Sequence, residues 1–188
     1  MRKVFKIILA VFLVLVIVAA VLVGLVLLDV PAYTATNSQT LTPSGALVGN
    51  ALVVYDPGFT GAAKTVAEKV AYTLQSNGYM VTLAGIKSNA ISSSNELFEI
   101  IVAGGPIYAG GPTASVKDFL SSLGNPMATV GVFGSGSGPQ EQADIDQIKN
   151  AIAVLPNGEA LSDAIIVKIG NSEDINQRTL DFVNDLIR

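Results

Sequence analysis

The chain has 188 residues, of which 50% are hydrophobic and only 14% are charged. It contains no cysteine, histidine or tryptophan, and this composition excludes disulfides, thiolate metal centres, cysteine nucleophiles and histidine-based acid–base catalysis. Beyond its first six residues the chain carries eight basic and 15 acidic side chains, which argues against a nucleic-acid partner. Any demanding chemistry therefore requires a bound organic cofactor.

The N-terminal segment 7–28, IILAVFLVLVIVAAVLVGLVLL, is apolar throughout. A helix of this length, at about 1.5 Å per residue, crosses a hydrocarbon core of about 30 Å. A cleaved signal peptide, the alternative, has an apolar region of only about 7–15 residues, so we predict one retained transmembrane helix. Because three basic residues precede it and the next positive charge is Lys64, residues 1–6 are predicted to be cytoplasmic and the domain to lie outside the cytoplasm. The expected location is the cell membrane, with a single pass.

Residues 29–46, DVPAYTATNSQTLTPSGA, are rich in serine, threonine and proline and show no apolar periodicity. This composition predicts a linker between the membrane and a domain that covers residues 47–188.

Within the domain, five short β-rich runs alternate with helical patterns. The expected strands are 51–55, 79–86, 99–103, 128–133 and 164–169. Helices are expected from Ala62 to Asn77, after Pro112, from the segment 137–140 and near Asn171 or Ser172, with only a short element in the polar segment 87–98. This alternation predicts an α/β domain in which one five-stranded parallel sheet is covered by helices on both faces, a three-layer, doubly wound arrangement.

Ligands in such sheets bind beyond the carboxyl ends of the strands, where the connections leave the sheet. Three of these connections have an unusual composition: DPGFTGAA after the first strand, GGPIYAGGP after the third and GSGSGP after the fourth. Because parallel strands end at the same edge, we expect the three connections to meet there and to form the ligand site.

The first connection has the features of an anion site. Gly58 and Gly61 let the backbone approach a ligand closely, and the amides that follow lie at a helix N-terminus, where the helix dipole favours an anion. Asp56 opposes a phosphate unless its side chain turns away or pairs with Lys64. The alternative interpretation is a tight strand-to-helix turn in which Thr60 is the N-cap.

The other two connections offer an aromatic ring and a small-residue backbone. Tyr108 lies between glycine-rich flanks, where it is suited either to stack on a flat heteroaromatic ring or to pack half-buried with a solvated hydroxyl. Residues 134–138 have no side chain larger than a hydroxyl, so they either present backbone amides to a ligand or form a flexible turn. The acidic residues that follow are spread around a helix, and no metal site is predicted.

The order of these predicted strands, helices and connections resembles that of the flavodoxin family over residues 47–188. The most specific segment is FEIIVAGGPIYAGGPTASVKDFL, residues 98–120, which is similar to the family's third strand, its isoalloxazine-contacting loop with a Pro-Ile-Tyr element, and the helix after it. The family's phosphate loop has the pattern Ser/Thr-x-Thr-Gly-x-Thr. Thr60 and Gly61 match this pattern, whereas Gly58 and Ala63 stand at the outer hydroxyl positions. The third connection matches only in position.

The resemblance implies the sheet order 2-1-3-4-5 and a noncovalently bound FMN that transfers one or two electrons. It assigns phosphate binding to Thr60 and Gly61 and flavin contact to Tyr108. The residues expected around the cofactor are Gly58, Phe59, Thr60, Gly61, Ala62, Ala63, Pro106, Ile107, Tyr108, Ala109, Gly110, Gly134, Ser135 and Gly136.

The predicted function is therefore that of a membrane-anchored FMN protein that transfers electrons to or from a redox partner protein. Two other functions stay open. One is an interaction module of the same fold that has lost the flavin, because two of the three hydroxyls of the phosphate loop are absent. The other is a flavin-dependent quinone or NAD(P)H reductase beside the membrane.

Overall fold

The computed structural model describes residues 2–93, 98–108 and 110–188. These residues form two compact units, Met1–Val30 and Pro31–Arg188, and each is described by itself.

The first unit is the long helix α1 (Arg2–Leu27). Its stretch Lys3–Leu25 has a mean hydropathy of 3.4, and none of its most apolar window is covered by protein. By length and composition this stretch is a candidate membrane span, although an N-terminal signal sequence passes the same test. The predicted apolar helix is present, and its insertion into a membrane stays a prediction.

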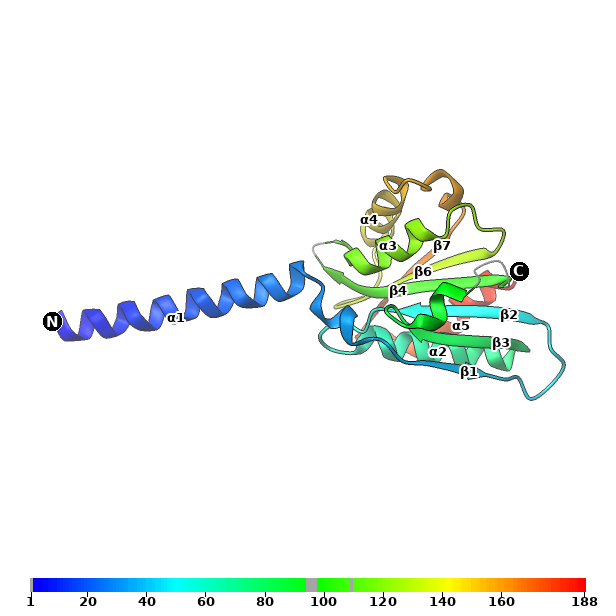
Figure 1. The fold of residues 1–188 in the computed structure, drawn as a ribbon, viewed down its shortest axis with the longest axis horizontal. Coiled ribbons are helices and arrows are strands. Elements are labelled where there is room, and N and C mark those ends of the chain that lie inside the picture. Colours follow the sequence, from blue (N-terminus) through cyan, green and yellow to red (C-terminus); the bar gives the residue numbers. More distant parts are fainter. Residues whose placement is uncertain (1, 94–97, 109) are drawn as a thin grey trace. The chain divides into compact units, whose positions relative to one another are not determined.

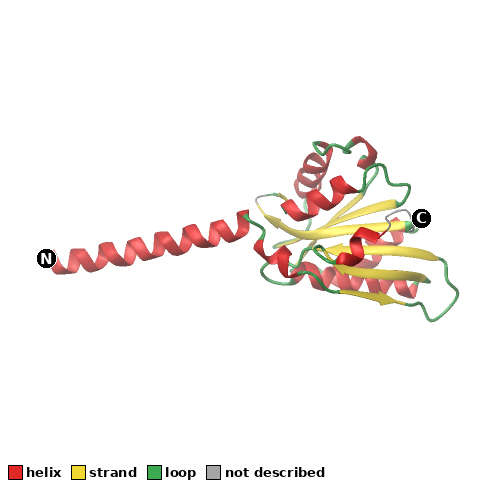
Figure 2. Cartoon of the chain, in the orientation of Figure 1, coloured by secondary structure: helices red, strands yellow, loops and turns green. Residues whose placement is uncertain are grey.

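The second unit contains the predicted parallel sheet (Figures 1 and 2). The parallel strands lie in the order β3-β2-β4-β6-β7, which is the expected order 2-1-3-4-5. Their bounds are β2 (Gly49–Tyr55), β3 (Tyr79–Gly85), β4 (Ile100–Tyr108), β6 (Thr129–Gly136) and β7 (Ile165–Gly170). A short strand β5 (Gly111–Pro112) turns back on β4 in antiparallel pairing.

Two pairs of helices cover the two faces of the sheet, which gives the predicted three layers. The helices are α2 (Ala62–Ser76), α3 (Ala114–Ser122), α4 (Gln142–Ala153) and α5 (Ile175–Leu186). Helices α2 and α5 pack on one face with Val53 and Val102, while α3 and α4 pack on the other with Leu52 and Ile101. This alternation along adjacent strand residues is the period-2 pattern of a sheet that is buried on both sides.

The connection between β3 and β4 contains a short 3-10 helix, η2 (Asn89–Ser93), as its polar sequence predicted. Two helix starts differ from the prediction. Helix α4 begins at Gln142, after the segment 137–140, and the amide of Glu141 donates to Asp144 Oδ2 at 2.8 Å. Helix α5 begins at Ile175, because the Asp174 carboxylate accepts the amides of the first turn and so acts as the N-cap.

The segment 29–46 is more ordered than the predicted linker. It contains a 3-10 helix, η1 (Val30–Thr34), and a strand, β1 (Ser38–Leu41), that pairs antiparallel with the outer edge of β3. Ala32 and Ala35 are buried in the domain core. Strand β1 was not predicted because most of its side chains are exposed, so its residues show no apolar alternation.

Packing at the centre of the sheet yields a first prediction. A Cβ added to Gly104 on β4 would lie 2.3 Å from the ring of Phe133, which is 1% exposed on the adjacent strand. We expect Gly104→Ala to lower the free energy of unfolding by about 1–3 kcal/mol, because a ring in a packed core has no room to move. Urea unfolding of the detergent-solubilised chain, followed by circular dichroism, measures this change.

Gly45→Ala is the matched control, since a Cβ there meets no atom within 4 Å. Equal midpoints for the two variants would contradict this account of the core.

Candidate functional site

The candidate site lies at the carboxyl edge of the sheet, where the connection from β2 to α2 meets the end of β4 (Figure 1). Tyr55, the last residue of β2, pairs with Gly104, and the amide of Asp56 donates to the Gly104 carbonyl at 2.9 Å. Strand β4 continues to Tyr108 before the chain turns back through β5. The predicted second loop is therefore the end of a β-hairpin.

Asp56 is the central side chain of this edge. It is 0% exposed, and its carboxylate accepts hydrogen bonds from the Gly58 amide at 2.9 Å, the Thr113 hydroxyl at 2.7 Å and the Ser115 hydroxyl at 3.2 Å. The sequence analysis expected the negative charge of Asp56 to repel a phosphate, but the side chain points into the protein. Lys64, the alternative partner, lies 3.8 Å from Glu68 on the surface of α2.

Thr113 and Ser115 are functional candidates that the sequence analysis missed. Both hydroxyls are buried at the start of α3, and through Asp56 they join this helix to the first loop. The signal in the sequence was an acidic residue directly after a buried strand, because a buried carboxylate requires donors nearby. Hydroxyl residues at the next helix start are such donors.

The first loop has the conformation of a tight turn into α2. Gly58 and Gly61 have φ values of 59° and 71°, which favour glycine. A side chain at Gly58 would also meet Pro106, at 2.7 Å from its Cγ. The N-cap residue is Gly61 and not Thr60, which the alternative interpretation of this loop had named, and the Thr60 hydroxyl accepts a long hydrogen bond of 3.3 Å from the Ala62 amide.

The amides at the start of α2 are available to a ligand. Within the described part of the chain, no protein acceptor is recorded for the amides of Thr60, Gly61 and Ala63, as is usual for the first turn of a helix. The side chain of Ala63 is 0% exposed and packs in the core, so this position offers only its backbone to a ligand. Thr60 is exposed and carries the only hydroxyl left of the three in the pattern.

The end of β4 places an aromatic pair beside this turn. The Tyr108 hydroxyl accepts a long hydrogen bond of 3.4 Å from the Phe59 amide, and the two rings lie 6.5 Å apart at an angle of 51°. Phe59 is 50% exposed. Pro106 and Ile107 pack at the base of the hairpin, whereas Gly110 lies against Gln147 of α4, and Ala109 is outside the described residues.

The predicted third loop is wrong in part, because Gly134, Ser135 and Gly136 belong to β6. Gly134 and Ser135 pair with Gly105 and Pro106, and Ser135 is 4% exposed. A Cβ at Gly134 would lie 2.3 Å from Ile107 Cδ1, so a glycine here permits close packing inside the sheet. The contact of these residues with a cofactor stays a prediction.

A partly buried ion pair holds the next turn, residues 137–141. Lys168 on β7 is 8% exposed, and its Nζ lies 2.9 Å from Asp144 Oδ2 and 3.2 Å from the Pro139 carbonyl oxygen. The hydrogen bond from Lys168, the backbone hydrogen bond from Glu141 and the Lys168 charge lower the pKa of Asp144 below its ordinary value, although burial opposes the shift. Among the described residues there is no group of three side chains that could hold a metal ion.

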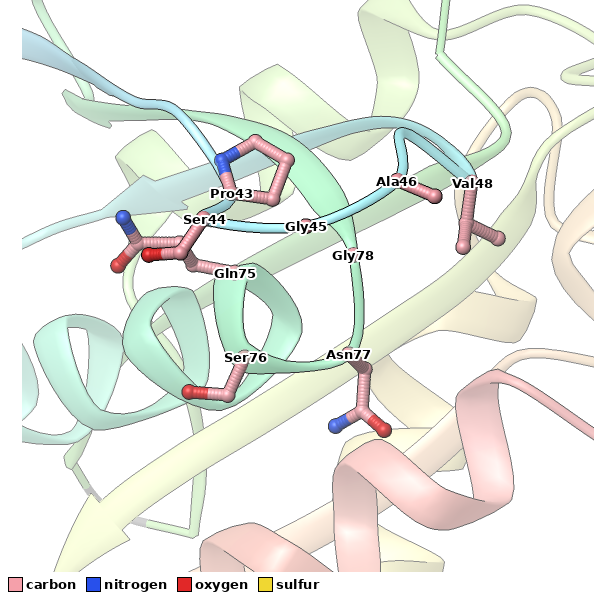
Figure 3. Close-up of a pocket in the computed structure, with 9 residues that line it drawn as sticks. All are labelled: Pro43, Ser44, Gly45, Ala46, Val48, Gln75, Ser76, Asn77 and Gly78. Carbon is pink, nitrogen blue, oxygen red and sulfur yellow. The ribbon is translucent and has the colours of Figure 1, made fainter.

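A cavity of about 420 Å³ lies at the opposite edge of the sheet, between the β1–β2 connection and the end of α2 (Figure 3). Three of the polar side chains that line it donate to backbone carbonyls: Gln75 to Thr42 at 2.7 Å, Ser76 to Tyr72 at 2.8 Å and Asn77 to Thr73 at 2.9 Å. None of the described residues that line it is charged. The unpaired amides and the exposed aromatic ring that could contact a ligand therefore lie at the carboxyl edge, and not in this cavity.

Comparison with known proteins establishes the fold. No protein-family model and no curated protein matches the sequence. Flavodoxin 2 from Bacillus cereus is similar in structure, with 17% identity and a TM-score of 0.50 over 73% of this chain and 97% of its own. An NADH:FMN oxidoreductase in its apo form matches with 14% identity and a TM-score of 0.55, over 74% of this chain and 90% of its own.

Rubredoxin oxygen:oxidoreductase from Desulfovibrio gigas matches with 16% identity and a TM-score of 0.54. The match covers 75% of this chain but only 36% of that larger protein. At these identities the likeness shows a flavodoxin-like fold over about three quarters of the chain.

The Asp56 network yields a second prediction. We expect Asp56→Ala to lower the free energy of unfolding by about 2–4 kcal/mol, because the Gly58 amide and two buried hydroxyls lose their acceptor. Asp118→Ala, at an exposed aspartate on α3, is expected to change it by less than about 0.5 kcal/mol. A mild effect of Asp56→Ala in chemical unfolding would show that the network does not hold this edge together.

The Lys168–Asp144 pair predicts a pH dependence. Because the folded-state pKa of Asp144 is lowered, its contribution to stability is fully present above the unfolded pKa of about 4 and is lost as the pH falls through the folded value. Asp144→Asn is expected to lower stability by about 1 kcal/mol at neutral pH and to reduce the acid-dependent loss. Unfolding midpoints between neutral and acidic pH test this, and parallel curves for both chains would refute it.

Proposed function

We propose that the chain is a membrane-anchored flavodoxin-like protein that binds FMN noncovalently at the carboxyl edge of its sheet and transfers electrons. The observation that carries this proposal is the first loop. Two glycines with positive φ turn its backbone into the N-terminus of α2, while its one acidic side chain, Asp56, is buried and accepts hydrogen bonds from within the protein.

The phosphate is proposed to bind at the N-terminus of α2. The amides of Thr60, Gly61 and Ala63 and the dipole of a 15-residue helix favour an anion there. The Thr60 hydroxyl accepts from Ala62, so its own hydrogen is still able to reach a phosphate oxygen. Compared with three hydroxyls, the single one lowers the affinity without removing the backbone donors, which form the larger part of the site.

The flavin ring is proposed to stack on Phe59 and Tyr108. A flat ring needs about 7 Å between two parallel aromatic planes, whereas these rings lie 6.5 Å apart and are tilted by 51°. We therefore infer that the flavin ring stacks on the outer surface of this aromatic pair and does not insert between the two rings. Half of the Phe59 side chain is exposed to receive such a ligand.

The electron chemistry in this proposal belongs to FMN, which accepts and releases one or two electrons. The chain supplies binding, orientation and cover, because it has no histidine or cysteine for acid–base or thiol chemistry. We propose that α1 anchors the domain in the cell membrane, with the N-terminus in the cytoplasm and the domain outside it, beside a redox partner protein. The basic residues before the candidate span and the absence of any until Lys64 support this orientation.

A second candidate function is an interaction module that binds no flavin. Two observations favour it: the Tyr108 hydroxyl already contacts the Phe59 amide, and the Ala63 methyl has replaced a hydroxyl inside the core. In this alternative, Phe59 and Tyr108 pack against each other at the carboxyl edge of the sheet and no ligand binds there. The two functions differ in whether the protein takes up FMN.

Titration with FMN distinguishes them. We expect the detergent-solubilised full chain to quench flavin fluorescence, and Thr60→Val to weaken binding about tenfold, because a hydrogen bond to a charged phosphate contributes about 1.5 kcal/mol. Thr73→Val, the same substitution in the last turn of α2, is the control and is expected to bind like the native chain. Absence of quenching at roughly tens of micromolar FMN would exclude the proposal and favour the interaction module.

A further inference from the structure

Lys168 on β7 is the only buried lysine among the residues that the structure describes. A buried ammonium group is stable only when acceptors surround it, and here they come from the turn 137–141 and from the first turn of α4. Its Nζ donates to the Pro139 carbonyl and to Asp144 Oδ2, while its backbone amide donates to Gln140 Oε1 at 2.9 Å. One residue of β7 therefore fastens both the turn and the start of α4.

The carboxyl end of β7 supports the same turn at two further points. The Asn171 amide donates to the Gly136 carbonyl at 3.1 Å, and the Gly138 carbonyl lies so close to Gly170 that no side chain fits between them. These backbone contacts hold the turn, whereas the ion pair of Lys168 continues to α4.

Helix α4 packs against the base of the hairpin that ends β4. Ile148 of α4 is 0% exposed, and Ile107 of β4 packs against the same core cluster. Both side chains reach over Gly134, because a Cβ added to this glycine would lie 2.3 Å from Ile107 Cδ1 and 3.2 Å from Ile148 Cδ1. Close packing of this kind passes a displacement of the helix on to the strand.

The tip of the hairpin contacts the same helix. Gly110, which has a φ of 86°, lies against Oε1 of Gln147, the residue before Ile148. Tyr108 stands between these two points of contact, directly after Ile107 and before the chain turns back through β5. The position of its ring therefore depends on where α4 lies.

We propose that Lys168 is a positioning residue for the ligand site: its ion pair with Asp144 holds the start of α4, and α4 holds the hairpin so that Tyr108 meets the flavin ring. The proposal rests on the proposed function for the identity of its ligand. Lys168 itself does not touch the ligand, and its effect on the site passes through Tyr108.

Hydrogen exchange of the FMN-free, detergent-solubilised full chain tests the link between Lys168 and the hairpin. Lys168→Met keeps most of the side-chain length and removes the charge. We expect about fivefold faster amide exchange in the turn 137–141 and in the hairpin of β4 and β5, with unchanged exchange in β2 and β3. Unchanged exchange in the hairpin refutes the proposal. Faster exchange throughout the sheet shows a purely structural role and refutes it as well.

Two further variants keep this comparison decisive. Asp144→Asn breaks the same ion pair from the side of α4, and we expect the same local pattern from it. Lys149→Met is the matched control, because Lys149 is an exposed lysine of α4, and it is expected to exchange like the native chain. Faster hairpin exchange in Lys149→Met would contradict a specific role of Lys168.

Titration with FMN measures the effect on the site. We expect Lys168→Met to raise the Kd for FMN about fivefold, and Lys168→Arg, which keeps a charged donor, to stay within about twofold of the native value. In a chain that already carries Tyr108→Ala, Lys168→Met is expected to have no further effect, because the lysine acts through that ring. Additive effects of the two substitutions would contradict the proposal.

The two proposals fail in different ways. A native chain that takes up no FMN refutes the proposed function and, with it, the role of Lys168 toward a flavin. A chain that binds FMN equally well with and without Lys168→Met refutes the role of Lys168 alone.

Discussion

The geometry of the carboxyl edge depends on one buried carboxylate. Asp56 accepts hydrogen bonds from the turn that follows it and from two hydroxyls at the start of α3, so it connects the first loop to the segment after the β4 hairpin. A buried charge is stable only with such donors, which is why three of them converge on it. The same arrangement removes a negative charge from the surface of the loop, so no acidic side chain of this loop is exposed beside the backbone amides at the start of α2.

The sequence predicted the sheet well because buried parallel strands and amphipathic helices have strong patterns. It did not show β1, whose polar side chains are mostly exposed at the sheet edge. It also placed Gly134 and Ser135 in a loop, because small residues indicate turns, whereas here both belong to β6 and Ile107 packs closely against Gly134 inside the sheet. The direction of the Asp56 side chain depends on hydroxyls 57 and 59 residues later, and no local pattern reveals such partners.

The central claim is that the first loop, with its acid directed inward and a single hydroxyl, holds FMN. The most direct measurement is the visible absorption spectrum of the full chain purified from its membrane in mild detergent. The account predicts the two absorption bands of bound flavin, released as FMN when the protein is denatured. A colourless protein that stays colourless after incubation with FMN and removal of the excess would contradict it.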